Sequence, residues 1–159
     1  MDAKKNIYLA VVGAGSASSE IYELAEAVGK EAALRGWIVL TGGLGGVMEA
    51  AAKGAREVGG LTLGILPGGD RNQANPYIHV AVATNMHHAR NALIAHTADA
   101  LIAVDGEYGT LSEVAFGLKL GKPVVGLMIP WKVPGLLTAR DPKEAVARVA
   151  ELVESCRIL

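Results

Sequence analysis

The chain has 159 residues, of which 51% are hydrophobic and 19% are charged. This length can bury one sizeable core, and no linker rich in Ser, Gly or Pro divides it, so we expect one domain over residues 1–159. The 15 basic and 16 acidic residues leave a net charge of −1 without a basic cluster, which argues against a nucleic-acid partner.

Targeting signals are absent from the sequence. The first residues lack the apolar core of a signal peptide, and no apolar stretch approaches the ~18 residues of a membrane helix. The one cysteine, Cys156, cannot form an internal disulfide. We expect a cytoplasmic protein that does not associate with membranes.

Strand-like and helix-like segments alternate along the chain. Strands are predicted at 7–12, 37–40, 61–66, 77–82, 100–104 and 124–129, and helices from about 19, at 47–57, about 86–97, 110–120 and from 142. Gly36 is expected just past the first helix, and Asp141 is expected to cap the last one. The alternation predicts an α/β fold, a Rossmann-like three-layer α/β/α sandwich with a doubly wound, mainly parallel sheet.

Glycine supplies 20 of the 159 residues, a share well above the usual ~7%. The excess glycines lie at predicted strand ends. Turns at 13–16, 42–46 and 106–109 should lie on one rim of the sheet. Each alone is explained by tight-turn geometry, but three together indicate a phosphate cradle, completed by N–H groups of helix N-termini. The candidate phosphate-binding or nucleotide-binding residues are Gly13, Gly15, Ser16, Gly42, Gly43, Gly45, Gly46, Met48, Gly106, Gly109 and Thr110.

The strand at 100–104 leads into a turn and a helix start that carries Glu113. Ligands of open α/β sheets bind at the carboxyl ends of such strands, which favours a site here. The same residues also fit a capping box, in which Thr110 and Glu113 bond to free N–H groups of the helix. Upstream, Arg90 would then be either a site residue or the partner of Glu107 or Glu113 in a structural ion pair.

Several nucleotide and metal chemistries are disfavoured. The second strand ends in Thr41-Gly42-Gly43 instead of the acidic residue that binds the ribose of NAD or FAD, and no Walker sequence occurs. The histidines 79, 87, 88 and 96 and the lone cysteine form no metal-ligand pattern. We therefore expect neither a metal nor a cofactor. Lys53, Lys119 and Lys122 are interpreted as solvated.

Two motifs carry a family resemblance. His88-x-Arg90 and Gly109-Thr110-x-x-Glu113, with Gly42-Gly43-x-Gly45-Gly46, resemble the LOG-type phosphoribohydrolases and the related molybdenum-cofactor carrier proteins, a Rossmann-like superfamily often mislabelled "lysine decarboxylase". The likeness covers nearly the whole chain. It departs from the family's patterns Pro-Gly-Gly-x-Gly-Thr-x-x-Glu and Met-His-x-Arg-Lys at Asp105, Glu107, His87 and Asn91.

The resemblance to LOG enzymes implies that Arg90 and Glu113 are a catalytic pair. They would cleave the N-glycosidic bond of a nucleoside 5′-monophosphate to free base and ribose 5-phosphate. A carboxylate stabilises the oxocarbenium-like transition state of that reaction, and a guanidinium suits phosphate or the departing base. The presence of both charged residues favours this hydrolase. Lysine decarboxylation is rejected, because it requires pyridoxal phosphate and a much larger chain.

The resemblance also allows a non-catalytic alternative, a carrier for molybdenum cofactor or another phosphorylated heterocycle. Glu107 weighs against phosphate binding, since a carboxylate beside a phosphate repels it unless the side chain turns away or binds a sugar hydroxyl. A homo-oligomer, most simply a homodimer, is expected from the apolar helical segments at 92–95 and 114–118. Burial of these segments within one subunit explains them equally well.

Overall fold

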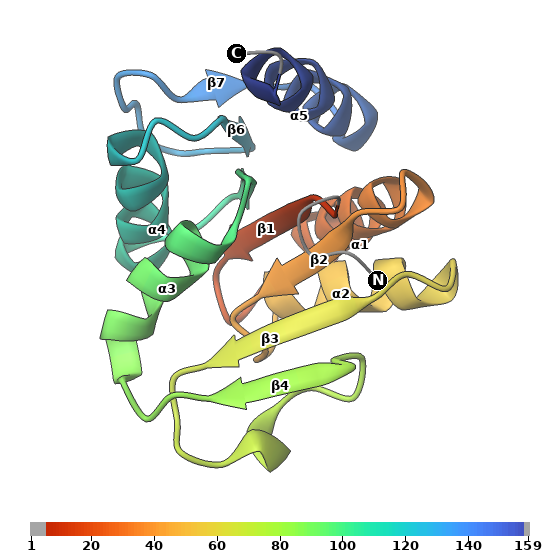
Figure 1. The fold of residues 1–159 in the computed structure, drawn as a ribbon, viewed down its shortest axis with the longest axis vertical. Coiled ribbons are helices and arrows are strands. Elements are labelled where there is room, and N and C mark those ends of the chain that lie inside the picture. Colours follow the sequence, from red (N-terminus) through yellow and green to blue (C-terminus); the bar gives the residue numbers. More distant parts are fainter. Residues whose placement is uncertain (1–5, 158–159) are drawn as a thin grey trace.

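The computed structural model describes residues 6–157, and its strands form one parallel sheet (Figure 1). The strands are β1 (Tyr8–Gly13), β2 (Ile38–Thr41), β3 (Thr62–Leu66), β4 (Val80–Ala83), β5 (Ala100–Val104), β6 (Val124–Leu127) and β7 (Leu137–Thr138). The α-helices are α1 (Ser19–Leu34), α2 (Val47–Glu57), α3 (Arg90–Thr97), α4 (Tyr108–Lys119) and α5 (Pro142–Arg157), with short 3-10 helices η1 (Arg71–Gln73) and η2 (His87–Ala89). Among the described residues, no helix has the length and apolar character needed to cross a bilayer.

The strand order β4-β3-β2-β1-β5-β6-β7 confirms the predicted doubly wound sheet. From β1 the chain builds outward to β4, returns to the other side of β1, and builds outward again to β7. All six neighbouring pairs are parallel. The direction of winding therefore reverses between β1 and β5, and the crevice beyond their carboxyl ends is where such sheets bind ligands.

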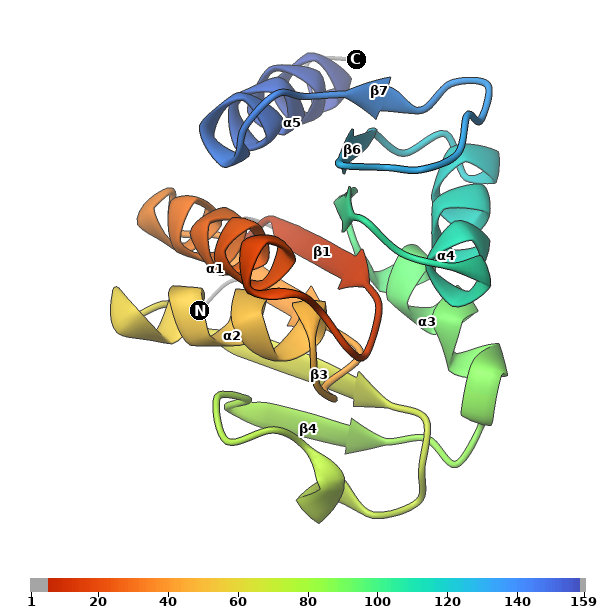
Figure 2. The same ribbon diagram turned by 180° about the vertical axis from the view of Figure 1, so that it is seen from behind.

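Helices cover both faces of the sheet (Figures 1 and 2). Side chains alternate between the two faces along β1: Val11 packs into a core with α1, α2 and α5, and Val12 into a second core with α3 and α4. The strands are buried on both sides, which explains why they read as continuous apolar runs in the sequence. This layering confirms the predicted α/β/α sandwich.

Helix boundaries were partly predicted. Gly36 has φ +76° beyond α1, and the Glu144 N–H donates to Asp141 Oδ1 at 2.9 Å, as expected for the two ends. The capping box is wrong, because α4 begins at Tyr108 with Glu107 at the N-cap position. Gly106, at φ +117°, turns the chain early enough for the helix to start before Thr110.

The prediction that the Lys122 side chain is solvated is also wrong. Its Nζ donates to the carbonyl oxygens of Ala95, His96 and Ala98 at 2.5 to 2.7 Å. Burial lowers the pKa of this half-buried ammonium group. Because the carbonyl groups at a helix C-terminus lack partners within the helix, Lys122 serves as the cap of α3.

Candidate functional site

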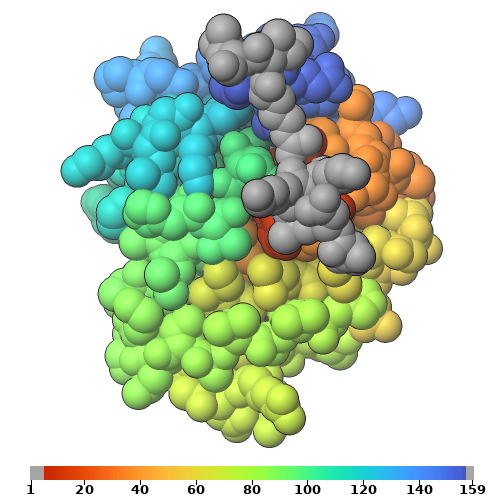
Figure 3. Space-filling model, viewed as in Figure 1, coloured from red at the N-terminus to blue at the C-terminus, as the bar shows by residue number. Residues whose placement is uncertain are grey.

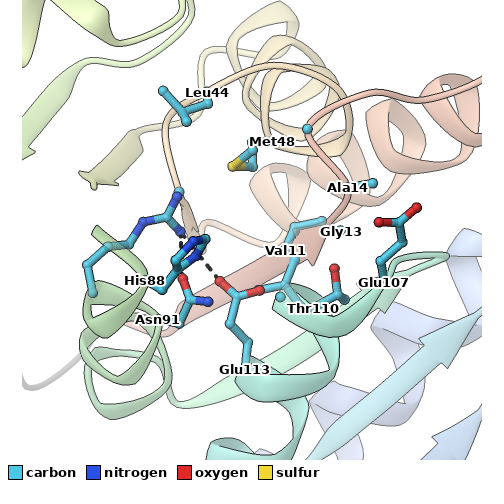
Figure 4. Close-up of a pocket in the computed structure, with 15 residues that line it drawn as sticks. Val11, Gly13, Ala14, Leu44, Met48, His88, Asn91, Glu107, Thr110 and Glu113 are labelled. Carbon is cyan, nitrogen blue, oxygen red and sulfur yellow. Dashed lines mark hydrogen bonds and ion pairs between the residues drawn. The ribbon is translucent and has the colours of Figure 1, made fainter. Parts of the chain in front are cut away.

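A cavity of about 320 Å³ opens at the carboxyl ends of β1, β2 and β5 (Figure 4). The turn after β1, the turn after β2, the segment leading into α3, and the start of α4 each supply part of its wall. The lining residues are Val11, Val12, Gly13, Ala14, Gly15, Gly42, Leu44, Met48, His88, Arg90, Asn91, Glu107, Gly109, Thr110 and Glu113. The cavity therefore lies at the point where the winding of the sheet reverses.

Part of the predicted residue set meets in this cavity. Arg90 and Glu113 line it, together with Gly13, Gly15, Gly42, Met48, Gly109 and Thr110. Ser16, Gly43, Gly45, Gly46 and Gly106 do not. Among these, Gly46 caps α2 at φ +61°, and a Cβ there would lie 2.3 Å from the Ala14 carbonyl oxygen. Gly46 thus allows the start of α2 to approach the β1 turn without itself facing the cavity.

Several residues that line the cavity are not among the predicted site residues. His88 and Asn91 flank Arg90, so the motif around Arg90 carried a signal for both. Leu44 and Ala14 lie inside the glycine turns, but only the glycines of these turns were predicted to bind a ligand. Val11 and Val12 belong to an apolar strand and carried no signal.

Arg90 and Glu113 form a buried pair at the base of the cavity. Arg90 Nη1 lies 3.6 Å from Glu113 Oε1, and the two residues are only 7% and 6% exposed. This separation exceeds that of a direct hydrogen bond. The Arg90 Nε is buried without a hydrogen-bond partner among the described residues, and a buried donor in this state favours a ligand acceptor.

A chain of hydrogen bonds ties Arg90 to the first turn of α4. Arg90 Nη1 donates to Asn91 Oδ1 at 3.1 Å, and Asn91 Nδ2 donates to Ser112 Oγ at 3.1 Å. The Ser112 hydroxyl in turn donates to the Gly109 carbonyl oxygen at 2.6 Å. Side-chain hydrogen bonds therefore connect the guanidinium to the first turn of α4.

Burial is the largest influence on the pKa values of both Glu113 and Arg90. It raises the pKa of Glu113 from 4.5 to about 8, and the attraction of Arg90 offsets this rise only in part. Burial also lowers the pKa of Arg90, while Glu113 opposes that shift. A guanidinium nevertheless stays protonated at neutral pH. Burial thus favours the neutral form of the carboxyl group while the guanidinium keeps its charge, which suits an anionic ligand.

Glu107 lies at the mouth of the cavity. It is exposed, and its side chain accepts no hydrogen bond from the first turn of α4, although Glu107 occupies the N-cap position. The N–H groups of a first helical turn have no partner within the helix. The start of α4 therefore offers free donors beside a carboxylate that accepts no hydrogen bond from them.

The family of this chain follows from a match along almost its whole length. The model of the SLOG cluster4 family matches residues 6–155. The chain belongs to the SLOG cluster4 family. This membership confirms the LOG and molybdenum-cofactor carrier superfamily expected from the sequence motifs.

Several known proteins are similar to this SLOG cluster4 protein. The molybdenum cofactor binding protein of Rippkaea orientalis superposes with a TM-score of 0.89 at 32% identity, covering 94% of this chain and 98% of the other. The Moco carrier protein of Chlamydomonas reinhardtii gives 0.86 at 34% identity, covering 95% and 99%. A cytokinin riboside 5′-monophosphate phosphoribohydrolase of Mycobacterium tuberculosis is 34% identical over 122 residues, which is 71% of this chain but 65% of the enzyme.

Proposed function

We propose that this protein binds a small phosphorylated heterocycle of the molybdenum-cofactor type in the cavity and holds it without cleaving it. The observation that carries this proposal is the burial of Glu113, which is only 6% exposed in a site where burial disfavours its charged form. A glycosidic hydrolase needs a charged carboxylate against the oxocarbenium-like transition state. Burial that disfavours the charged form of Glu113 works against this role.

The make-up of the cavity supports binding. A volume of about 320 Å³ lies at the lower end of the range for small-molecule sites. Gly42 leaves room for the Arg90 guanidinium, which supplies positive charge, and the first turn of α4 supplies free N–H donors. The near-complete coverage of both molybdenum-cofactor proteins points the same way.

Two measurements test retention without turnover. Protein purified without oxygen should carry molybdenum and a pterin that fluoresces after oxidation, and loss of both is expected in Arg90→Ala. AMP and N6-substituted adenosine monophosphates should release no free base at pH 7, as followed by chromatography. Base release that disappears in Glu113→Gln would overturn the carrier proposal.

The hydrolase remains a second candidate, because Arg90 and Glu113 lie side by side in the cavity. The Mycobacterium tuberculosis relative supports the same candidate. If this protein cleaves nucleotides, Glu113 acts as the charged carboxylate, so the rate should rise between pH 6 and pH 9 as Glu113 ionises. A rate that is flat or falls over this range would exclude that role for Glu113.

We also propose a homodimer, formed through the face that carries α3 and α4. Ile94, Ala95 and Val114 are buried within the subunit, so the apolar helices are explained in part by the monomer. An apolar set remains exposed on the same side of the sheet, and we call it the α3–α4 face: Val80, Val82, Leu93, Phe116 and Leu120. Figure 3 shows α3, α4 and β4 side by side on this surface.

A further inference from the structure

The turn between β5 and α4 is held by a side chain from a later part of the chain. The Trp131 indole Nε1–H donates to the Gly106 carbonyl oxygen at 3.3 Å. Trp131 lies in the loop between β6 and β7, 25 residues beyond Gly106 in the sequence. Three of the next four residues after Gly106 line the cavity, namely Glu107, Gly109 and Thr110. A loop outside the cavity therefore contacts the backbone of a segment that forms its wall.

Trp131 is itself anchored in the fold. Its ring is half-buried and packs against the core beneath α3 and α4, together with Ile129 and Leu136 of the same loop. The Asp105 N–H donates to the Leu127 carbonyl oxygen at 2.9 Å, so β5 and β6 stay paired up to the start of the turn. A side chain held in this way can keep the carbonyl group that it binds in one direction.

The Gly106 carbonyl group has an alternative partner inside α4. In an α-helix each N–H donates to the carbonyl group four residues earlier, so Thr110 would donate to Gly106 if the helix began one residue sooner. In the structure the first hydrogen bond of α4 runs instead from the Leu111 N–H to the Glu107 carbonyl oxygen at 2.9 Å. Gly106 has no side chain to fix the turn, so an outside partner decides where its carbonyl group points.

The Thr110 N–H is left free as a consequence. Within residues 6–157, it donates no hydrogen bond. Thr110 is only 4% exposed and lies on the cavity wall between Glu107 and Glu113 (Figure 4). A donor without a partner in a buried residue favours a ligand acceptor, and the first turn of a helix suits an anionic one. An earlier start of α4 would remove this donor from the cavity.

We propose that Trp131 is a positioning residue of the site, which holds the Gly106 carbonyl group outside α4 and so keeps the Thr110 N–H free for a ligand. The inference rests on the proposed function, because the ligand is the phosphorylated heterocycle that the cavity is proposed to hold. Trp131 does not line the cavity and acts only through the turn. The β6–β7 loop thereby sets how many donors α4 offers.

The first test compares ligand affinity in a variant that lacks only the indole donor. Trp131→Phe keeps an aromatic ring and removes the N–H group. GMP is a suitable probe, because it is stable and joins a phosphate to the aminopyrimidinone ring that pterins also contain. Calorimetry should show a ~3- to 10-fold loss of GMP affinity, as expected for one lost hydrogen bond. If GMP does not bind, the pterin content of the anaerobically purified variants makes the same comparison.

The other tryptophan of the chain supplies a matched control. Trp37 is 7% exposed and precedes β2, at the edge of the sheet opposite the cavity. Trp37→Phe should lower the melting temperature at least as much as Trp131→Phe, because it truncates a more deeply buried side chain. It should nevertheless keep the wild-type affinity for GMP. A structural role of Trp131 alone would reduce affinity only in step with stability.

The second test follows the Thr110 amide without any ligand. In Trp131→Phe the Gly106 carbonyl group becomes available to the Thr110 N–H, so this amide should exchange with solvent more slowly than in the wild type. Trp37→Phe should leave its exchange unchanged. Hydrogen exchange measured by NMR makes the comparison residue by residue, and its result is independent of the proposed function.

The outcomes are distinct. Wild-type affinity in Trp131→Phe, or an equal loss of affinity in both phenylalanine variants, overturns the positioning role and leaves the proposed function standing. An unchanged exchange rate at Thr110 also overturns it, because the Gly106 carbonyl group then does not compete for that donor. If the wild-type protein binds no GMP and holds no pterin, the proposed function fails and the role of Trp131 in binding fails with it.

Discussion

The guanidinium of Arg90 lies against Gly42, so closely that a Cβ at Gly42 would be 2.5 Å from Nη1 and 2.8 Å from Nη2. The same Cβ would be 2.6 Å from the sulfur of Met48. A side chain at position 42 would therefore force the Arg90 guanidinium or the Met48 thioether to shift. The second glycine turn thus makes room for a cation, a task distinct from turning the chain.

Gly42→Ala should displace Arg90 or Met48. We expect a loss of ~1–3 kcal/mol in the free energy of unfolding from overpacking, and a loss of at least ~10-fold in ligand affinity. Urea denaturation and calorimetry measure the two effects. Gly109→Ala is the stability control, because no atom lies within 4 Å of its Cβ position and alanine favours the helix. An equal loss of stability in both variants would contradict the steric role of Gly42.

The chain from Arg90 to α4 predicts energetic coupling between Asn91 and Ser112. Asn91→Ala leaves buried polar groups without partners and should cost ~1–3 kcal/mol, and Ser112→Ala should cost less. The double variant should cost less than the sum, with a coupling energy of ~0.5–3 kcal/mol. Additive losses in urea denaturation would show that the two side chains act independently.

Glu113 predicts a specific dependence of stability on pH. Its pKa is about 8 in the folded protein and near 4.5 when unperturbed, so the folded state binds more protons between these values. The free energy of unfolding should therefore decrease as the pH rises from about 5 to about 8. Glu113→Gln removes this contribution, and its unfolding free energy should vary less over that window. A slope identical to that of the wild type would refute the raised pKa.

Lys122 predicts a contrast between two neighbouring lysines. Lys122→Met removes the donor to three carbonyl oxygens at the end of α3 and should cost ~1–3 kcal/mol. Lys119→Met, on the exposed last turn of α4, should change stability by less than ~0.5 kcal/mol. Thermal denaturation of both variants makes the comparison, and equal losses would rule out the capping role.

The α3–α4 face predicts the state of association. Phe116→Glu places a charge within the α3–α4 face and should shift the protein from dimer to monomer. Light scattering coupled to size exclusion gives the mass directly. Leu34→Glu is the control, because Leu34 is exposed on α1, across the sheet. A wild-type protein that is monomeric at micromolar concentration would refute the proposed dimer.

Much of the fold could be predicted because its signals are local. The strands that build the centre of the sheet are buried on both faces and read as apolar runs, whereas β7 is short and exposed and gave no such run. The start of α4 was misplaced because Thr110 and Glu113 have the spacing of a capping box, while the deciding feature is the backbone conformation at Gly106. The prediction that Lys122 is solvated is wrong for a similar reason, since its three acceptors lie more than 20 residues away in the sequence.

The sequence predicted the two charged residues of the candidate site, but not how deeply they are buried. The motif identified Arg90 and Glu113, and the structure brings them together. The depth of their burial, and hence the raised pKa of Glu113, depends on packing that no spacing rule expresses. The same holds for Glu107. Its charge is evident from the sequence, but the lack of a hydrogen bond from its side chain to the first turn of α4 is not.

The walls of the cavity come from chain segments near residues 13, 42, 90 and 109, which become neighbours only after parallel strands have paired. Such non-local pairing is slow compared with helix formation. No helix or single crossover unit taken alone contains the complete pocket. A ligand should therefore bind and stabilise only the fully folded chain. Its binding should slow hydrogen exchange in the central strands and should not stabilise a partly folded chain.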